Sequence, residues 1–180
     1  MPQTDSPILI LSDLRSAHNV GSILRTADGA GVTTVYCCGI TPYPRLERDL
    51  RPEHVIVSNT KQIHKTALGA EETVAVRHAD DCLALITTLK TSGYAIYALE
   101  NNCERAQNIF NFTPNGEFAI ILGSETDGLT SEVLNACDAV LEIPMRGTKN
   151  SLNVSVAAGI GLYYSHCVKG VSSAQRPLVE

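Results

Sequence analysis

The amino-acid sequence predicts an α/β protein with a mostly parallel sheet covered by helices on both faces. Short apolar segments with the length of buried strands, such as residues 8–12 and 118–122, recur along the chain. Segments with helical spacing of apolar residues separate them, as in parallel sheets whose crossovers are helices. The 180 residues are 44% hydrophobic and contain no internal repeat, linker or low-complexity tract. We therefore expect one domain spanning residues 1–180.

The first half of the chain predicts two strands joined by a helix. We expect strands at residues 8–12 and 33–38, and a helix between them that ends near Gly29. The apolar stripe of this helix places Arg25 on the opposite, exposed side. Residues 39–53 contain three prolines and three arginines and fit no regular element. Two interpretations stay open for them: a solvated surface loop, and a mobile basic lip over a site.

The second half of the chain continues the alternation of helices and strands. The expected elements are, in order, a short helix at 62–68, a strand at 73–77, a helix capped by Asp80 or Asp81 and ended by Gly93, a strand at 94–99, a polar, turn-rich segment at 101–117, a strand at 118–122, a short helix at 130–136 and a strand at 140–143. One domain accounts for all of them.

The stretch Glu142–Ser165 combines a strand end, a polar loop and a helix of small and apolar residues. Pro144 ends the strand, and Ser151 or Asn150 is expected to cap the helix. Each of the two glycines inside this helix costs roughly 1 kcal/mol relative to alanine. That cost indicates a close approach to the backbone by a ligand, another helix or a second subunit. The alternative is a glycine-tolerant core helix.

The composition narrows the classes of function. A net charge of −5 gives the chain no overall basic field, although nucleic-acid binding needs only one local basic face. The six cysteines are scattered, without a C-x-x-C pair, and we interpret them as reduced, mostly buried thiols. The N-terminus lacks the features of a signal peptide, and no apolar span has the length of a membrane helix. We therefore expect a cytoplasmic protein with no membrane partner.

Ligands of parallel sheets bind beyond the carboxyl ends of the strands, which directs attention to residues 13–19, 99–102, 123–128 and 144–151. Common nucleotide signatures fail there: no G-x-G-x-x-G follows the first strand, and residues 123–128 lack the Lys-Ser/Thr of a phosphate loop. No H-E-x-x-H, G-x-S-x-G or clustered His/Cys set is present, so metal hydrolysis and serine nucleophile chemistry have no support and no metal is expected.

Three motifs in order do resemble a known family. HNVGSILRTADGAG, IILGSETDGL and IPMRGTKNSLNVSVAAGI are similar to the three motifs of the SpoU/TrmH class of SPOUT RNA 2′-O-ribose methyltransferases, and they span nearly the whole chain. The resemblance implies an α/β fold with a C-terminal deep trefoil knot. It also implies a homodimer that binds S-adenosylmethionine in the knot and acts on RNA. It gives no separate RNA-binding domain to this chain.

The resemblance also implies site residues. Loops after three strands would hold the cofactor, mainly through main-chain groups and apolar side chains. By motif position, the cofactor-binding residues are Leu99, Glu100, Leu122, Gly123, Ile143, Met145 and Leu152. The catalytic candidates are Asn19, Arg25, Glu125, Ser151 and Asn153.

Arg25 corresponds to the arginine that the family places at the ribose 2′-hydroxyl. An arginine, with a pKa above roughly 12, is a poor resting base. We therefore hypothesise that Arg25 clamps the adjacent phosphate and stabilises developing alkoxide charge, while the proton passes to a phosphate oxygen or water. Asn19, Ser151 and Asn153 would hold the ribose and Arg25, and Glu125 would fix Arg25 or Asn19.

RNA capture must come from a local basic patch or from the surface of a dimer. The candidate contacts are Arg15, His18, Arg45, Arg48, Arg51 and Lys149. Transfer RNA is favoured slightly over ribosomal RNA, because a small catalytic unit suits a compact substrate. Two alternatives stay open: a base-nitrogen RNA methyltransferase on the same knotted scaffold, and a non-catalytic protein that binds the cofactor or RNA.

Overall fold

The protein is described by a computed structural model covering residues 6–101 and 103–173, with side chains placed up to residue 165. Within this part, a seven-stranded sheet has the order β3-β2-β1-β6-β4-β7-β5, and every adjacent pair is parallel. The strands are β1 Ile8–Ser12, β2 Thr34–Cys38, β3 Ala75–Ala79, β4 Ala95–Leu99, β5 Gln107–Asn108, β6 Phe118–Leu122 and β7 Ala139–Glu142.

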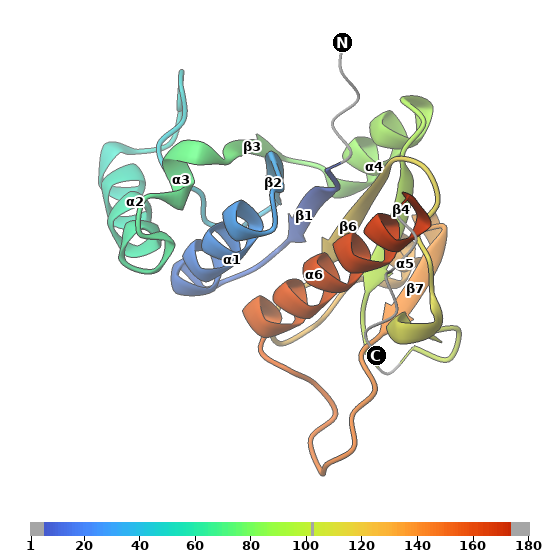
Figure 1. Ribbon diagram of the computed structural model, residues 1–180. Helices are drawn as coiled ribbons and strands as arrows, with labels where there is room; N and C mark the ends of the chain where they lie inside the picture. The colour runs from blue at the N-terminus through green and yellow to red at the C-terminus, as the bar shows by residue number, and fades with distance from the viewer. Residues whose placement is uncertain (1–5, 102, 174–180) are drawn as a thin grey trace, which may run out of the picture.

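The helices lie on both faces of the sheet, as the sequence predicts (Figure 1). They are α1 Ala17–Gly29, α2 Glu53–Ala67, α3 Ala70–Thr73, α4 Cys82–Thr91, α5 Ser131–Ala136 and α6 Val154–Ser173, with a 3₁₀ turn at Ile109–Asn111. Leu9 and Leu11 of β1 pack in the core shared with α1, α2 and α6, whereas Ile10 packs in the core shared with α4 and α5. This alternation follows from the two-residue repeat of a strand buried on both sides.

The structure differs from the expected boundaries most clearly between residues 53 and 75, and it adds the two-residue strand β5 and a 3₁₀ turn within residues 101–117. Helix α2 begins at Glu53, directly after Pro52, and is much longer than the expected helix at 62–68. Its buried side comprises only Ile56, Ile63 and Ala67, so its apolar periodicity is weak. The next strand starts at Ala75, two residues late, because the short helix α3 occupies the preceding residues.

Helices α1 and α2 pack so closely that no side chain fits between them at Gly21. A Cβ atom added at Gly21 would lie 2.2 Å from Thr66 Oγ1 and 2.3 Å from the carbonyl oxygen of Ile63. The Thr66 hydroxyl also donates to the carbonyl of His18 at 2.9 Å. The close packing of α1 against α2 therefore requires a glycine at position 21.

Helix α6 packs beside α1 and across the sheet. Gly159 faces Thr26 of α1, where an added Cβ would lie 3.4 Å from the Thr26 methyl carbon. Gly161 faces β4, where an added Cβ would lie 2.9 Å from Leu99 Cδ2. The close approach expected from the helix glycines is therefore present at Gly161, toward the Leu99 side chain of the sheet, whereas Gly159 makes ordinary van der Waals contact with α1.

Candidate functional site

A cavity of about 630 Å³ opens at the carboxyl ends of β4, β6 and β7, beside the start of α6. Of the residues predicted to bind the cofactor, those that line it are Leu99, Glu100, Leu122, Gly123, Ile143 and Leu152. Met145 does not line it; it lines a neighbouring cavity of about 420 Å³ formed by the loop after β7. The cavity thus lies where ligands of parallel sheets bind.

The loop after β6 folds back tightly against its own start. A Cβ atom on Gly123 would lie 2.4 Å from the carbonyl carbon of Gly128, and Gly128 itself has a φ of 66°. Its N–H donates to the carbonyl of Ser124 at 3.1 Å. The Glu100 carboxylate accepts the N–H of Leu129 at 2.9 Å, which ties the loop to the end of β4.

Residue Asn101 holds the loop after β7 in place. Its side-chain amide donates to the carbonyl oxygens of Ile143, at 3.1 Å, and Asn150, at 3.2 Å. Its amide oxygen accepts the N–H of Ile143 at 3.2 Å. Asn101 lies in a segment predicted to face the ligand, although no role was expected for it; a polar residue just beyond a buried strand is the signal in the sequence.

Gly147 in the same loop does not approach other backbone. A Cβ added there would meet no atom within 4 Å. The glycines that permit close contact around the cavity are instead Gly123 and Gly128, whose loop closes on itself.

Three predicted catalytic residues form one hydrogen-bonded chain at the rim of the cavity. The Asn19 side chain donates to Glu125 Oε1 at 2.7 Å and accepts from the Asn153 amide at 3.2 Å. Asn153 Oδ1 in turn accepts from the N–H of Ser155 at 2.9 Å and from its hydroxyl at 2.6 Å. The first turn of α1, the loop after β6 and the start of α6 thus meet at this point.

The environment of Glu125 favours its ionised form. Burial raises the pKa of this carboxyl, but the hydrogen bonds from the Asn19 side chain and from the backbone N–H groups of Arg15 and Ser16 outweigh it and leave the pKa below its ordinary value. The carboxylate faces the first turn of α1, where the positive end of the helix dipole adds to the same effect.

The helix cap expected at Ser151 or Asn150 is wrong. Helix α6 begins at Val154, and Asn153 caps it by accepting the Ser155 N–H. Leu152 and Asn153 separate Ser151 from the first residue of the helix. Ser151 therefore lies in the loop before α6, where it lines the cavity.

Arg25 lies on the outer face of α1 and does not line the cavity. Its guanidinium has no hydrogen bond or ion pair with any residue in the described part of the chain. Arg25 makes no contact with the Glu125–Asn19–Asn153 chain, and of the two partners expected for Glu125, Arg25 or Asn19, the structure shows Asn19.

Among the predicted RNA contacts, Arg15 lies at the cavity rim. Its guanidinium pairs with Asp127 at 3.1 Å, and its backbone N–H donates to Glu125 at 3.2 Å. His18, Arg48 and Lys149 are all exposed.

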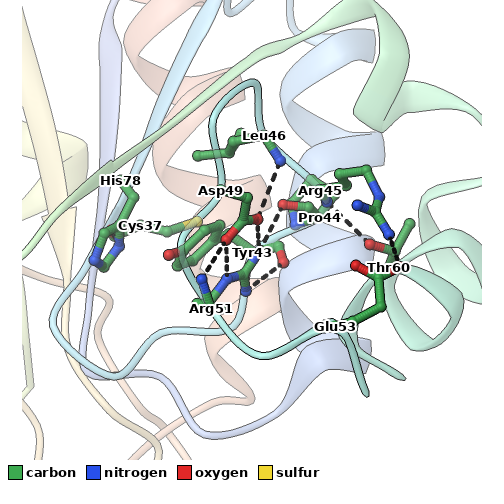
Figure 2. A network of polar contacts seen from close by, with 10 residues as sticks. All are labelled: Cys37, Tyr43, Pro44, Arg45, Leu46, Asp49, Arg51, Glu53, Thr60 and His78. Carbon is green, nitrogen blue, oxygen red and sulfur yellow. Dashed lines mark hydrogen bonds and ion pairs between the residues drawn. The ribbon is translucent and has the colours of Figure 1, made fainter. Parts of the chain in front are cut away.

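The remaining two arginines belong to a folded network in the segment between β2 and α2 (Figure 2). Arg51 donates to Asp49 at 2.6 Å and to the carbonyl oxygens of Tyr43, at 3.0 Å, and Pro44, at 3.1 Å. Its guanidinium carbon lies 3.3 Å from the centre of the Tyr43 ring, and Arg45 pairs with Glu53. Because its donors are used internally, Arg51 stabilises this segment, and its assignment as an RNA contact stays a prediction.

The segment is irregular, as predicted, and it combines exposed positions, such as Leu50 at 98%, with a buried polar network. The Arg51 side chain is only 17% exposed and that of Asp49 only 3%. On its other face the Tyr43 ring stacks on His78 at 4.4 Å. These contacts tie Tyr43 to the end of β3, and the exposed remainder of the segment fits the surface-loop interpretation.

Within the described residues, no group of three or more His, Cys, Asp or Glu side chains is arranged to hold a metal ion. In the same part of the chain, no helix combines the length and the apolar character needed to cross a membrane.

Fold and site together define a parallel α/β protein with a ligand cavity formed by the loops after β4, β6 and β7. The chain belongs to the SpoU rRNA Methylase family, whose model matches residues 6–163. This confirms the resemblance carried by the three motifs.

Among its curated relatives is a protein of Staphylococcus aureus (strain MSSA476) that is named for the TrmH family of tRNA/rRNA methyltransferases. The two are 36% identical over 158 residues, which cover 88% of this chain and 57% of the relative. The chain thus spans little more than half the length of this relative.

Solved structures show the same fold. A crystal structure of an RNA 2′-O ribose methyltransferase is 26% identical, with a TM-score of 0.75, and the match covers 94% of this chain and 58% of that one. An AdoMet-bound rRNA methyltransferase from Sinorhizobium meliloti is 22% identical, with a TM-score of 0.76, covering 92% of this chain and 57% of that one. The expected fold class is confirmed, while the path of the chain through a knot stays a prediction.

Proposed function

We propose that this chain transfers the methyl group of S-adenosylmethionine to a ribose 2′-hydroxyl of RNA. The observation that carries the proposal is the Glu125–Asn19–Asn153 chain at the rim of a cavity lined by the predicted cofactor residues. Family membership and the named activities of the relatives support the same reaction. We also propose that residues 1–180 act as one catalytic domain in the cytoplasm.

The cavity fits the proposed cofactor. Its volume of about 630 Å³ lies within the usual range for small-molecule sites. Leu99, Leu122 and Ile143 offer apolar surface for a purine ring, and the carboxylates of Glu100 and Glu125 suit a cationic ligand. When bound, S-adenosylmethionine supplies an activated methyl group. Glu100 accepts the Leu129 N–H, which ties the loop after β6 to the end of β4 at the cavity.

The residues of the chain would align the nucleophile and stabilise its charge. The ribose hydroxyl attacks in line, so placing it accurately lowers the barrier. Asn19 and Asn153 orient each other, and Ser151 lines the cavity together with Asn153. Arg25 would bind the adjacent phosphate and stabilise the developing alkoxide, with the proton passing to a phosphate oxygen or water.

The position of Arg25 supports a homodimer as the active unit. It is exposed on α1, outside the cavity, and α6 lies alongside with Val156 and Tyr163 both 50% exposed. Pairing two chains through this apolar face would bury these side chains and bring the partner subunit's Arg25 to the opposing cavity. We therefore propose that each active site combines one chain's Asn153 with the partner subunit's Arg25.

Subunit mixing tests this arrangement. Chains carrying Arg25→Ala are co-expressed with chains carrying Asn153→Ala, and the mixed dimers are isolated through two different affinity tags. One site of each mixed dimer is intact if Arg25 acts across the interface, so activity should return to roughly half the wild-type value. If Arg25 acts within its own chain, both sites are defective and the mixed dimer stays as inactive as the parents.

Incubation with labelled S-adenosylmethionine and total RNA from a deletion strain tests the reaction itself. We expect label in one nucleotide of a transfer RNA, in a linkage that resists alkaline cleavage because the 2′-oxygen is blocked. Label in an alkali-sensitive linkage would indicate base methylation, and label in ribosomal RNA would overturn the preferred substrate. Cofactor binding without any transfer would indicate a non-catalytic protein.

A further inference from the structure

The proposed reaction leaves a cluster of thiols unused on the sheet face covered by α4 and α5. Cys38 is the last residue of β2 and Cys82 the first residue of α4. Cys38 is fully buried in the core beneath α4 and α5, and Cys82 packs against the same core with part of its surface exposed. A third buried thiol, Cys137, belongs to that core as well.

The fold brings Cys38 and Cys82 together through the ends of two paired strands. Cys38 is opposite Ala79 in the parallel β2–β3 ladder, and the N–H of Gly39 donates to the Ala79 carbonyl at 3.0 Å. Only two residues separate Ala79 from Cys82. The chain therefore leaves β3 beside Cys38 and enters α4 two residues later, so that Cys82 packs against the core that contains Cys38.

We propose that Cys38 and Cys82 are a site of reversible oxidation, at which hydrogen peroxide converts the two thiols into a disulfide. This site is separate from the cavity, and the proposal does not depend on the methyl-transfer reaction.

The two thiols have different surroundings, and we therefore expect them to have different roles in the oxidation. Interaction with the Cys38 thiol lowers the pKa of Cys82 and outweighs both burial and the nearby carboxylates of Asp13 and Asp81, which raise it. Cys82 also lies at the first position of a ten-residue helix, where the dipole favours a thiolate. The interaction with Cys82, together with burial, raises the pKa of Cys38 and keeps it protonated. Cys82 is therefore the attacking group and Cys38 the resolving group.

The chemistry balances in two steps. The Cys82 thiolate attacks one peroxide oxygen, so that an S–O bond forms, the O–O bond breaks, and the departing hydroxide takes up the proton released by Cys82. Cys38 then attacks the sulfur of the resulting sulfenic acid, so that the S–S bond forms and the S–O bond breaks. Its proton leaves with the hydroxide as a second water. Two thiols are oxidised, and one peroxide is reduced to two waters.

Cys137 supplies a matched control within the same cluster. Burial raises the pKa of its thiol to about 12, and the thiol already donates to the carbonyl of Val133 at 3.2 Å. It belongs to the same core but lacks the features that activate Cys82. Cys137→Ser should therefore leave the oxidation of the other two cysteines unchanged.

The test uses the full-length protein, reduced, desalted and treated with one equivalent of hydrogen peroxide. Free thiols are then blocked with an alkylating reagent, and non-reduced peptides are identified by mass spectrometry. We expect one peptide pair linked through Cys38 and Cys82, in wild type and in Cys137→Ser, that disappears on treatment with dithiothreitol.

Two variants examine the order of events. In Cys38→Ser, the sulfenic acid on Cys82 should persist and be trapped by a 1,3-dicarbonyl reagent, whereas in Cys82→Ser position 38 should stay unmodified. Circular dichroism establishes that each variant is folded, and the wild-type peptide map decides the question if one is not. The proposal is overturned if wild-type Cys82 stays free after peroxide, or if the link forms only in denaturant.

Discussion

The cavity rim and the segment between β2 and α2 are both polar, loop-built regions, but they use their charged groups in opposite ways. In the segment, Arg51 places its donors on Asp49 and two backbone carbonyls, and the Tyr43 ring covers its face. Arg25, in contrast, has no hydrogen bond or ion pair within the described residues and is exposed. The first arrangement stabilises a fold, and the second leaves a cation available to a ligand.

The difference shows that the number of arginines in a loop does not measure its affinity for RNA. In the sequence, the three arginines of this segment indicate a basic patch. In the structure, Asp49 neutralises Arg51 and Glu53 neutralises Arg45. Arg48 is the only one of the three without a partner among the described residues. The number of unsatisfied donors on exposed cations is the better guide to a phosphate-binding surface.

Replacing Arg25 should have the largest effect on activity. Arg25→Ala should reduce the single-turnover rate of methylation by about 10²- to 10³-fold, because a preorganised cation no longer faces the developing alkoxide. Stability should stay within about 0.5 kcal/mol of wild type, since Arg25 is exposed. Arg77→Ala, which removes an exposed arginine from the edge strand β3, is the control for loss of charge alone.

Arg25→Lys, measured across a range of pH, examines the planar clamp. Lysine keeps the charge but cannot bind phosphate in a bidentate manner, so the rate should stay well below wild type at every pH. A lysine variant with nearly full activity would show that charge alone suffices.

Replacing Arg51 should have the largest effect on stability. Arg51→Ala leaves the Asp49 carboxylate, which is 3% exposed, without its cation. Breaking such a pair typically lowers the free energy of unfolding by about 3 kcal/mol. Urea unfolding measures the change, and Arg48→Ala in the same segment should change it by less than about 0.5 kcal/mol. Equal losses in both variants would mean that the contacts of Arg51 contribute no more stability than an unpaired arginine at the surface.

Gly123→Ala should have an intermediate effect on both properties. The new methyl group would lie 2.4 Å from the Gly128 carbonyl carbon, so the loop after β6 must shift away from β4. We expect about 2 kcal/mol of destabilisation, typical of overpacking, together with weaker binding of the cofactor by calorimetry. Gly147→Ala is the matched control, because open space surrounds Gly147. Wild-type affinity in Gly123→Ala would show that the loop adapts without cost.

The smallest expected effect is the contribution of Glu125 to the pH dependence of stability. Since hydrogen bonds hold the pKa of its folded form below the ordinary value of about 4.3, the stabilisation is complete above that value and is lost as the pH falls through the folded pKa. Wild type should therefore be more stable than Glu125→Gln at pH 7, and the difference should shrink steadily as the pH is lowered below about 4. A difference that does not change with pH would exclude the ionised carboxylate as its source.

The sequence predicted the sheet and the cavity better than the elements with weak periodicity. Strands such as Phe118–Leu122 are apolar throughout because both faces of the sheet are covered, and that signal is local. Helix α2 was predicted at less than half its length, because few of its side chains are buried. The motifs located most of the cavity wall, but Met145 fell outside because its loop turns toward the second cavity.

The partnerships of individual side chains could not be predicted from sequence, because they depend on contacts between distant segments. Asn19 and Asn153 are far apart in the chain, and no local pattern shows that they share a hydrogen bond. The same holds for Arg51, since only the folded segment shows that Asp49 and two carbonyl oxygens surround it. Family resemblance proposed the residues, and the geometry shows which of them touch.

The strand order has a consequence for how the protein folds during synthesis. Strand β1 pairs with β2 early, but its other neighbour is β6, where Ile8 meets Ala119. The central ladder therefore cannot close until most of the chain has left the ribosome, and long-range pairing of this kind is slow. The rim hydrogen bond between Asn19 and Asn153 forms later still, when α6 docks beside α1. Nascent chains thus stay without a complete site until the last helix is in place.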